Sequence, residues 1–165
     1  MYNIDKGNKE SRCVIWSKTK QTLESRLPED LKGRVKFLYE VLRVGSHGCK
    51  DHVFSILVDG EPWFRSNPKN WEQDLDEIRN HGIVSNIYGV AMLYVHQFLN
   101  VLSIDEAISS ENYFIRMLAL LDSRLGKRRI RKLADHVDEE PEWFRKWIYL
   151  RLENVNSKKI YEVKL

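Results

Sequence analysis

Residues 34–66 contain three stretches with the alternating pattern of extended chain. In RVKFLYEVLRV, one face carries four β-branched or aromatic side chains: Val35, Phe37, Tyr39 and Val41. This period of two residues is typical of a β-strand. HVFSILV at 52–58 predicts a second strand, and the Asp59-Gly60 pair that follows is a strong hairpin signal. EPWFRS predicts a short third strand at the sheet edge, because Pro62 lacks a backbone N–H donor. The sequence therefore predicts a three-stranded antiparallel meander.

A helix is expected just before this sheet, in WSKTKQTLESRL. Its apolar positions share one face at helical spacing: Trp16, Leu23 and Leu27. Ser17 is the expected N-cap and Pro28 the expected stop. A sheet of only three strands needs a cover for its apolar face, so we expect this helix to pack on it. Residues 1–12 are polar and unpatterned, and we expect them to be disordered.

After residue 66 the apolar spacing changes to the helical period. Helices are expected over 67–82, 85–101, 111–125, 127–137 and 139–152. A capping box from Ser103 to Glu106 predicts one more short helix. The helix at 111–125 is apolar nearly all round, which is typical of a central helix. The tail at 154–165 is expected to be either a strand or a loose end.

These patterns predict an α+β fold. Residues 13–66 are expected to form a helix and a β-meander, and residues 67–153 a mainly helical part. The helical part is expected to pack on or beside the sheet, and the two parts form either one domain or two lobes.

Composition limits the function classes. The chain of 165 residues has a net charge of only +3, whereas dedicated nucleic-acid binders are usually more basic. It has two cysteines, too few for a disulfide framework, and no apolar run long enough to span a membrane. The start lacks the apolar region of a signal peptide. We therefore expect a soluble, cytoplasmic protein.

Enzyme and cofactor motifs are missing from the sequence. It has no P-loop, no G-x-G-x-x-G, no G-x-S-x-G and no H-E-x-x-H pattern. His47, Cys49 and His52 lie close together, but zinc takes about four ligands and no second pair stands at motif spacing. We expect a non-enzyme without cofactor or metal, although an enzyme assembled from distant residues remains an alternative.

A basic run, SRLGKRRIRK at 123–132, is the strongest candidate for a binding site. On a helical wheel, one stripe of the following helix is apolar, formed by Ile130, Leu133, Ala134 and Val137. The cations therefore point outward, and they crowd the helix start, where the macrodipole disfavours positive charge. The candidate binding residues are Arg124, Lys127, Arg128, Arg129, Arg131 and Lys132. Because short basic runs are common, an ordinary solvated helix face is the simpler interpretation.

Arg151 falls in the middle of the apolar face of the last helix. A buried guanidinium needs a carboxylate partner. Asp122, at the edge of the apolar face of the 111–125 helix, is the predicted partner in a structural ion pair.

Four motifs resemble those of a family of small, uncharacterised bacterial proteins. They are a W-S-K-T opening, an L-K-G-R-V strand entry, a V-D-G hairpin and an L-D-x-R-x-G-K-R helix joint, found at 16–19, 31–35, 58–60 and 121–128. The resemblance covers most of the chain except roughly residues 66–90. It implies a bacterial, cytoplasmic protein and brings no activity or catalytic residues.

The expected function is that of a non-catalytic protein-interaction module, comparable to an immunity protein or an adaptor. The sequence identifies neither its protein partner nor its oligomeric state. The alternative is phosphate-backbone binding to RNA or DNA through residues 127–132, which would be salt-sensitive.

Overall fold

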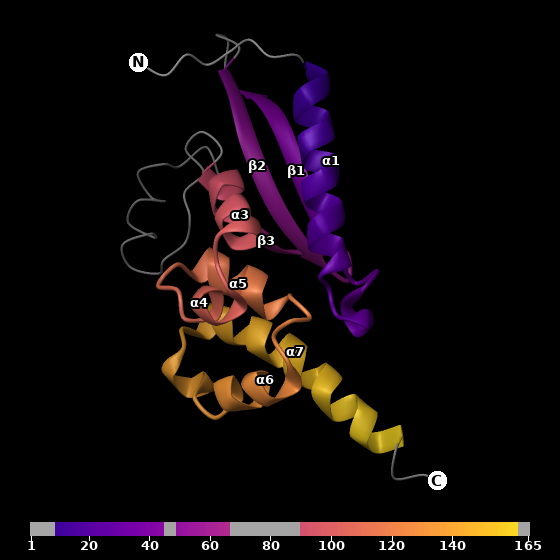
Figure 1. Ribbon diagram of the computed structural model, residues 1–165, viewed down its shortest axis with the longest axis vertical. Helices are drawn as coiled ribbons and strands as arrows, with labels where there is room; N and C mark the ends of the chain where they lie inside the picture. The colour runs from indigo at the N-terminus through magenta and orange to yellow at the C-terminus, as the bar shows by residue number, and fades with distance from the viewer. Residues whose placement is uncertain (1–8, 45–48, 67–89, 162–165) are drawn as a thin grey trace.

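The computed structural model describes the backbone of residues 9–44, 49–66 and 90–161, and the side chains of residues 16–41, 53–66 and 91–153. The strands are β1 (Val35–Val44), β2 (Cys49–Val58) and β3 (Glu61–Arg65). They form one antiparallel sheet in the order β1-β2-β3, so the predicted meander is confirmed (Figure 1). With the helices that follow, this sheet makes the fold α+β.

One face of the sheet is apolar and buried. The antiparallel register places Phe37 beside Ile56, and Ile56 beside Phe64 on the next strand. All three side chains are buried, because alternate residues of paired strands point to the same side. The alternating pattern of β1 therefore predicted the core face correctly, although Val41 near the strand end is half exposed.

A β-bulge interrupts the pairing of β2 with β3. Ile56 pairs with Phe64 but Leu57 pairs with Pro62, which leaves Trp63 as the extra residue. Bulges redirect side chains, and Trp63 makes an edge-to-face contact with Trp147 of the last helix at 5.3 Å between ring centroids. The bulge thus ties the edge strand to the helical part of the chain.

The β2–β3 hairpin turns at Asp59 and Gly60. Both have positive φ angles, of 52° and 91°, which is the conformation of the favoured two-residue hairpin turns. The Asp59 carboxylate accepts hydrogen bonds from Arg34 Nε and Nη2 at 2.7–3.2 Å. These bonds hold the pKa of Asp59 below its ordinary value.

This ion pair predicts a pH dependence of the hairpin. Because its pKa is depressed in the folded protein, Asp59 stabilises the fold above its unfolded pKa, and the contribution is lost as pH falls through the folded pKa. Titration of the Asp59 carboxyl resonance by NMR should show the depressed pKa, and Arg34→Gln should return it to the ordinary range. An unchanged titration in Arg34→Gln would contradict the assignment.

Helix α1 (Lys9–Ser25) lies along β1 (Figure 1). Its Trp16 ring contacts Tyr39 and Phe54 at 5.4 and 5.9 Å, so the helix covers the apolar face as expected. It begins at Lys9 instead of at the predicted N-cap Ser17, so residues 9–12, expected to be disordered, are helical. Residues 1–8 lie outside the described part.

The second part of the chain is helical. Its elements are α3 (Val90–Asn100), α4 (Ile104–Ile108), α5 (Tyr113–Leu120), α6 (Lys127–Ala134), the 3-10 turn η2 (Val137–Glu139) and α7 (Glu142–Tyr161), which follow the sheet in Figure 1. The predicted capping box from Ser103 to Glu106 is present at the start of α4. The helix expected over 67–82 lies outside the described residues.

Helix α5 is the central helix, as its apolar composition predicted. From Phe114 to Leu120 every side chain except Arg116 is buried. The Phe114 ring contacts Phe54 of β2, Phe64 of β3 and Tyr94 of α3. One cluster of buried side chains runs from α1 through the sheet to α7.

The ends of α5 and α7 also differ from the predictions. Helix α5 ends at Leu120 instead of near Leu125, because the Asp122 carboxylate accepts the backbone N–H of Arg124 at 2.8 Å and the chain turns there. Helix α7 continues to Tyr161, so residues 154–161 are helical and not a strand. Among the described helices, none combines the length and apolarity that crossing a membrane requires.

Candidate interaction surface on helix α6

Helix α6 lies at the end of the helical part that is remote from the sheet (Figure 1). Its Ile130 is buried and Leu133 half-buried, both packed in the hydrophobic cluster that includes α7. This inner stripe is the one that the helical wheel predicted. The opposite side of α6 faces solvent and carries the basic run.

Four cations share the outer side of α6: Lys127, Arg128, Arg131 and Lys132. At 100° per residue they occupy one continuous arc of about 140°. All four are exposed. Within the part of the chain that the structure describes, none of them takes part in an ion pair or a side-chain hydrogen bond. We refer to these four residues as the cationic face.

Arg129 is not part of this face. Its guanidinium points toward α4, where Nε and Nη2 bind the two carboxylate oxygens of Asp105 at 2.8 and 2.9 Å. The positive charge is therefore compensated within the molecule. Of the predicted binding residues, Arg129 has a structural partner that the sequence did not indicate.

Arg124 is also engaged. Its Nε and Nη2 bind both carboxylate oxygens of Asp122 at 2.8–3.0 Å. These hydrogen bonds raise the pKa of Arg124. The guanidinium is held against the α5–α6 connection and is not part of the cationic face.

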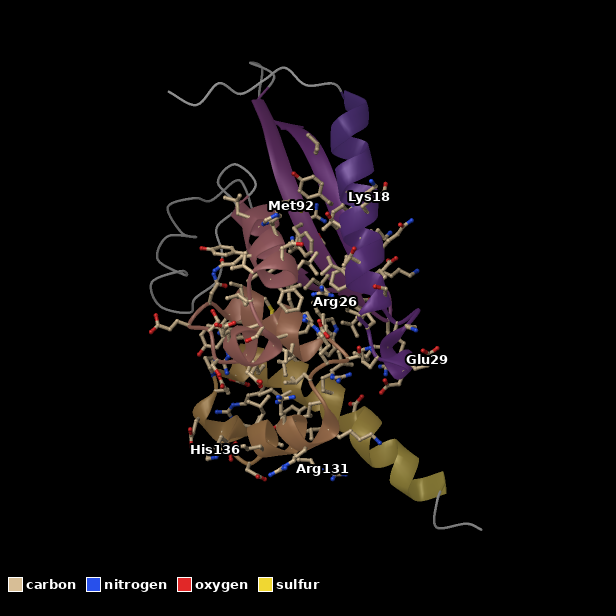
Figure 2. All side chains as sticks on the ribbon, in the orientation of Figure 1. Lys18, Arg26, Glu29, Met92, Arg131 and His136 are labelled. Atoms are coloured by element: carbon tan, nitrogen blue, oxygen red, sulfur yellow. The ribbon has the colours of Figure 1, made fainter. Side chains whose placement is uncertain are left out.

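Carboxylates follow the cationic face along the chain. Asp135 is the C-cap of α6, and Asp138, Glu139 and Glu142 come in η2 and the start of α7. Figure 2 shows Arg131 and His136 along the same lower edge of the molecule, so the basic and acidic segments adjoin. We refer to Asp135, Asp138, Glu139 and Glu142 as the acidic corner.

The acidic corner has few internal partners. The Asp138 carboxylate reaches Arg145 at 3.5 Å, yet its side chain is 92% exposed. Among the described side chains, Glu139 pairs with His136 alone, at 3.0 Å, and this is an ion pair only when the imidazole is protonated. Exposed pairs of this kind contribute little to stability. The surface of α6 and η2 is therefore positive at one end and negative at the other.

A buried carboxylate lies beneath the start of this surface. Asp122 is 1% exposed, and besides Arg124 it faces Arg26 Nη1 at 4.0 Å. The predicted ion pair between Asp122 and Arg151 is not present among the described residues. Arg151 is buried as predicted, but its Nη2 donates to the carbonyl oxygen of Leu125 at 3.2 Å. Burial lowers the pKa of Arg151, and the charges of two acidic residues, including Asp122, oppose that shift.

Arg26 was missed by sequence reasoning. Its Nη2 donates to the carbonyl oxygen of Leu99 at 3.2 Å, and its guanidinium lies 6.0 Å from the Phe98 ring centroid. The Arg124 guanidinium lies 5.8 Å from the same centroid. Burial, followed by the nearby charge of Arg124, lowers the pKa of Arg26. Figure 2 shows Arg26 in the middle of the molecule, between the end of α1 and the helical part. Nothing local in the sequence distinguishes it from other helix-end arginines.

The model of the SF0329 protein family matches residues 15–91 and residues 76–152 of this chain. The two overlapping matches together reach from α1 to α7. The chain belongs to the SF0329 protein family. No curated protein and no solved structure matches it.

The described part of this SF0329 family protein contains no metal-binding cluster. In the described residues, no group of three or more His, Cys, Asp or Glu side chains could hold a metal ion. His47 and the side chains of Cys49 and His52 lie outside that part. The described surface of the SF0329 family protein presents exposed charges in the cationic face and in the acidic corner.

Proposed function

We propose that this SF0329 family protein is a non-catalytic, cytoplasmic bacterial interaction module that docks a protein partner through the cationic face of α6. One observation carries the proposal: four exposed cations share one helix face and have no ion-pair partner among the described residues. An acidic surface on a partner would supply the missing counter-charges. An immunity-protein or adaptor role agrees with such a module.

The acidic corner favours a protein partner over nucleic acid. Its carboxylates lie at the C-cap of α6 and in η2 and α7 directly after it, where they would repel a phosphate backbone that continued past the cations. A protein surface can present acidic and basic groups in the matching order. Complementary charges of this kind speed association and select the partner.

Capture from the native host tests the proposal. The tagged full chain is expected to retain a protein from a nuclease-treated extract. Changing Arg128→Gln and Arg131→Gln should weaken retention about tenfold, since each exposed ion pair contributes about 0.2–1 kcal/mol. Quantitative mass spectrometry of the captured fraction gives the measurement.

The matched control removes two cations elsewhere. Lys18 on α1 and Lys36 on β1 are exposed, and no ion pair within the described residues involves them. Lys18→Gln with Lys36→Gln changes the net charge equally and should retain the partner as the unmodified chain does. Equal losses in both variants would show an unspecific charge effect and refute the cationic face as the docking site.

Phosphate-backbone binding is the second candidate. Lys127 and Arg128 lie at the N-terminus of α6, where the N-cap Gly126 has no side chain to accept the first backbone N–H groups. Helix N-termini of this kind attract phosphate. A binding constant for RNA or DNA that falls steeply with salt, with a slope lowered by about one in Arg131→Gln, would favour this candidate. No binding at low salt would exclude it.

A further inference from the structure

We infer that the cationic face of α6 docks on the acidic corner of a second copy of this chain, and that the reciprocal contact forms at the same time. The two α6 helices would lie antiparallel across a twofold axis. This inference rests on the proposed function, because it names the partner of the same surface.

The first argument is the order of charges along α6. Lys127 and Arg128 lie in the first turn of the eight-residue helix, Arg131 and Lys132 lie in its last turn, and the carboxylate of Asp135 follows at the C-cap. At 100° per residue, Asp135 lies within the arc of the cationic face, one turn beyond Arg131 and two turns beyond Arg128. One outward face therefore carries both signs, separated along the helix axis.

Such a face is complementary to itself in one orientation only. A twofold axis across the middle of the face runs the two helices antiparallel, so each copy's first turns meet the other copy's C-terminal end. The cations of each copy then oppose Asp135 and Glu139 of the other. A parallel arrangement would place like charges together and would be repulsive.

The helix dipoles provide the second argument. Within one copy, Lys127 and Arg128 stand at the positive N-terminus of α6, where its macrodipole disfavours them. In the antiparallel pair the same side chains lie beside the negative C-terminus of the other α6. The arrangement that is unfavourable in the isolated molecule becomes favourable in the pair. This accounts for cations at a helix start, which the fold of a single copy does not explain.

The accessibility of the acidic corner is the third argument. The Glu139 side chain is 77% exposed and Asp138 is 92% exposed, so their contacts with His136 and Arg145 leave most of each carboxylate free for a partner. No large apolar side chain is among the exposed ones on α6. The association should therefore be weak, reversible and sensitive to salt, since exposed charges are screened over about 10 Å at 0.1 M ionic strength.

Sedimentation equilibrium of the full chain tests the inference. We expect dimers at low salt and an increase in the dissociation constant of at least about tenfold when sodium chloride is raised from about 50 to 500 mM. Arg128→Glu with Arg131→Glu makes the net charge of the face negative, although Lys127 and Lys132 remain, and should abolish the dimer. Asp135→Lys with Glu139→Lys makes the same face basic and should also abolish the dimer.

The mixture of these two variants provides the decisive measurement. In an equimolar mixture, the two different chains present faces of opposite net charge, so heterodimers should form although neither variant dimerises alone. The control Lys18→Glu with Lys36→Glu should dimerise as the unmodified chain does. Circular dichroism during heating establishes that each variant is folded.

Several outcomes would overturn the inference. An unmodified chain that stays monomeric at low salt excludes it, and so does a dimer that persists in both charge-reversed variants. Failure of the mixture to associate excludes the antiparallel pairing. A monomeric chain that still captures an acidic protein through Arg128 and Arg131 would refute the second copy as partner while the proposed function survives.

Discussion

Replacing Phe114 with alanine should lower the free energy of unfolding by about 3–5 kcal/mol, the usual cost of deleting a buried phenylalanine ring. Phe114 is fully buried, and its ring contacts Phe54, Phe64 and Tyr94 at 5.0–6.5 Å between centroids. The substitution therefore leaves a cavity between the sheet, α3 and α5. Urea denaturation followed by tryptophan fluorescence measures the loss.

Two further variants support the interpretation of Phe114. Phe114→Leu keeps most of the volume and should cost clearly less than the alanine variant. Tyr149→Ala, at a side chain that is 46% exposed on α7, should cost far less than the core substitution. A loss below about 1 kcal/mol for Phe114→Ala would mean that α5 does not fill the space above the sheet.

Replacing Asp122 with alanine should cost about 3–5 kcal/mol, the range observed when one partner of a buried ion pair is removed. Asp122 is 1% exposed and faces Arg26 and Arg124. Without the carboxylate, Arg26 and Arg124, whose charge lowers the pKa of Arg26, would lose their shared counter-charge. Chemical denaturation of the single variant gives the cost.

A double-mutant cycle separates the ion pair from the helix connection. Arg124→Ala should cost less than Asp122→Ala, since the Arg124 side chain is 41% exposed and water can replace it. The double variant should cost less than the two single changes added together, because the residues interact directly. Strict additivity would contradict a coupled pair at this position.

The sheet could be predicted from the sequence because its signals are local. Alternation in β1 and the Asp59-Gly60 pair each specify geometry over a few residues, and the structure has the strands and the hairpin there. The register irregularity at Trp63 could not be predicted, since it depends on the contact with Trp147 in a helix far along the chain. The end of α5 was missed although its cause is local, since the Asp122 carboxylate accepts the backbone N–H of Arg124 two residues further on.

In the candidate site too, local features could be predicted from the sequence, whereas contacts between distant elements could not. The helical wheel separated the outward cations from Ile130 without knowledge of any other element. It could not show that Arg129 binds Asp105, because that pair joins residues of two different helices. Burial of Arg151 followed from its position on an apolar face, but its acceptor, the carbonyl oxygen of Leu125, was set by the way α7 packs.

The contact between the end of α1 and the α5–α6 connection has a consequence for the order of folding. The backbone N–H of Ser123 donates to the carbonyl oxygen of Arg26 at 2.7 Å, which closes a long loop of chain. Contacts of such large sequence separation slow folding, and synthesis delivers the N-terminal segments first. The sheet and α1 therefore leave the ribosome well before α5. The apolar face of the sheet stays uncovered until Phe114 of α5 has been synthesised. During that interval the nascent chain exposes aromatic surface that chaperones can recognise.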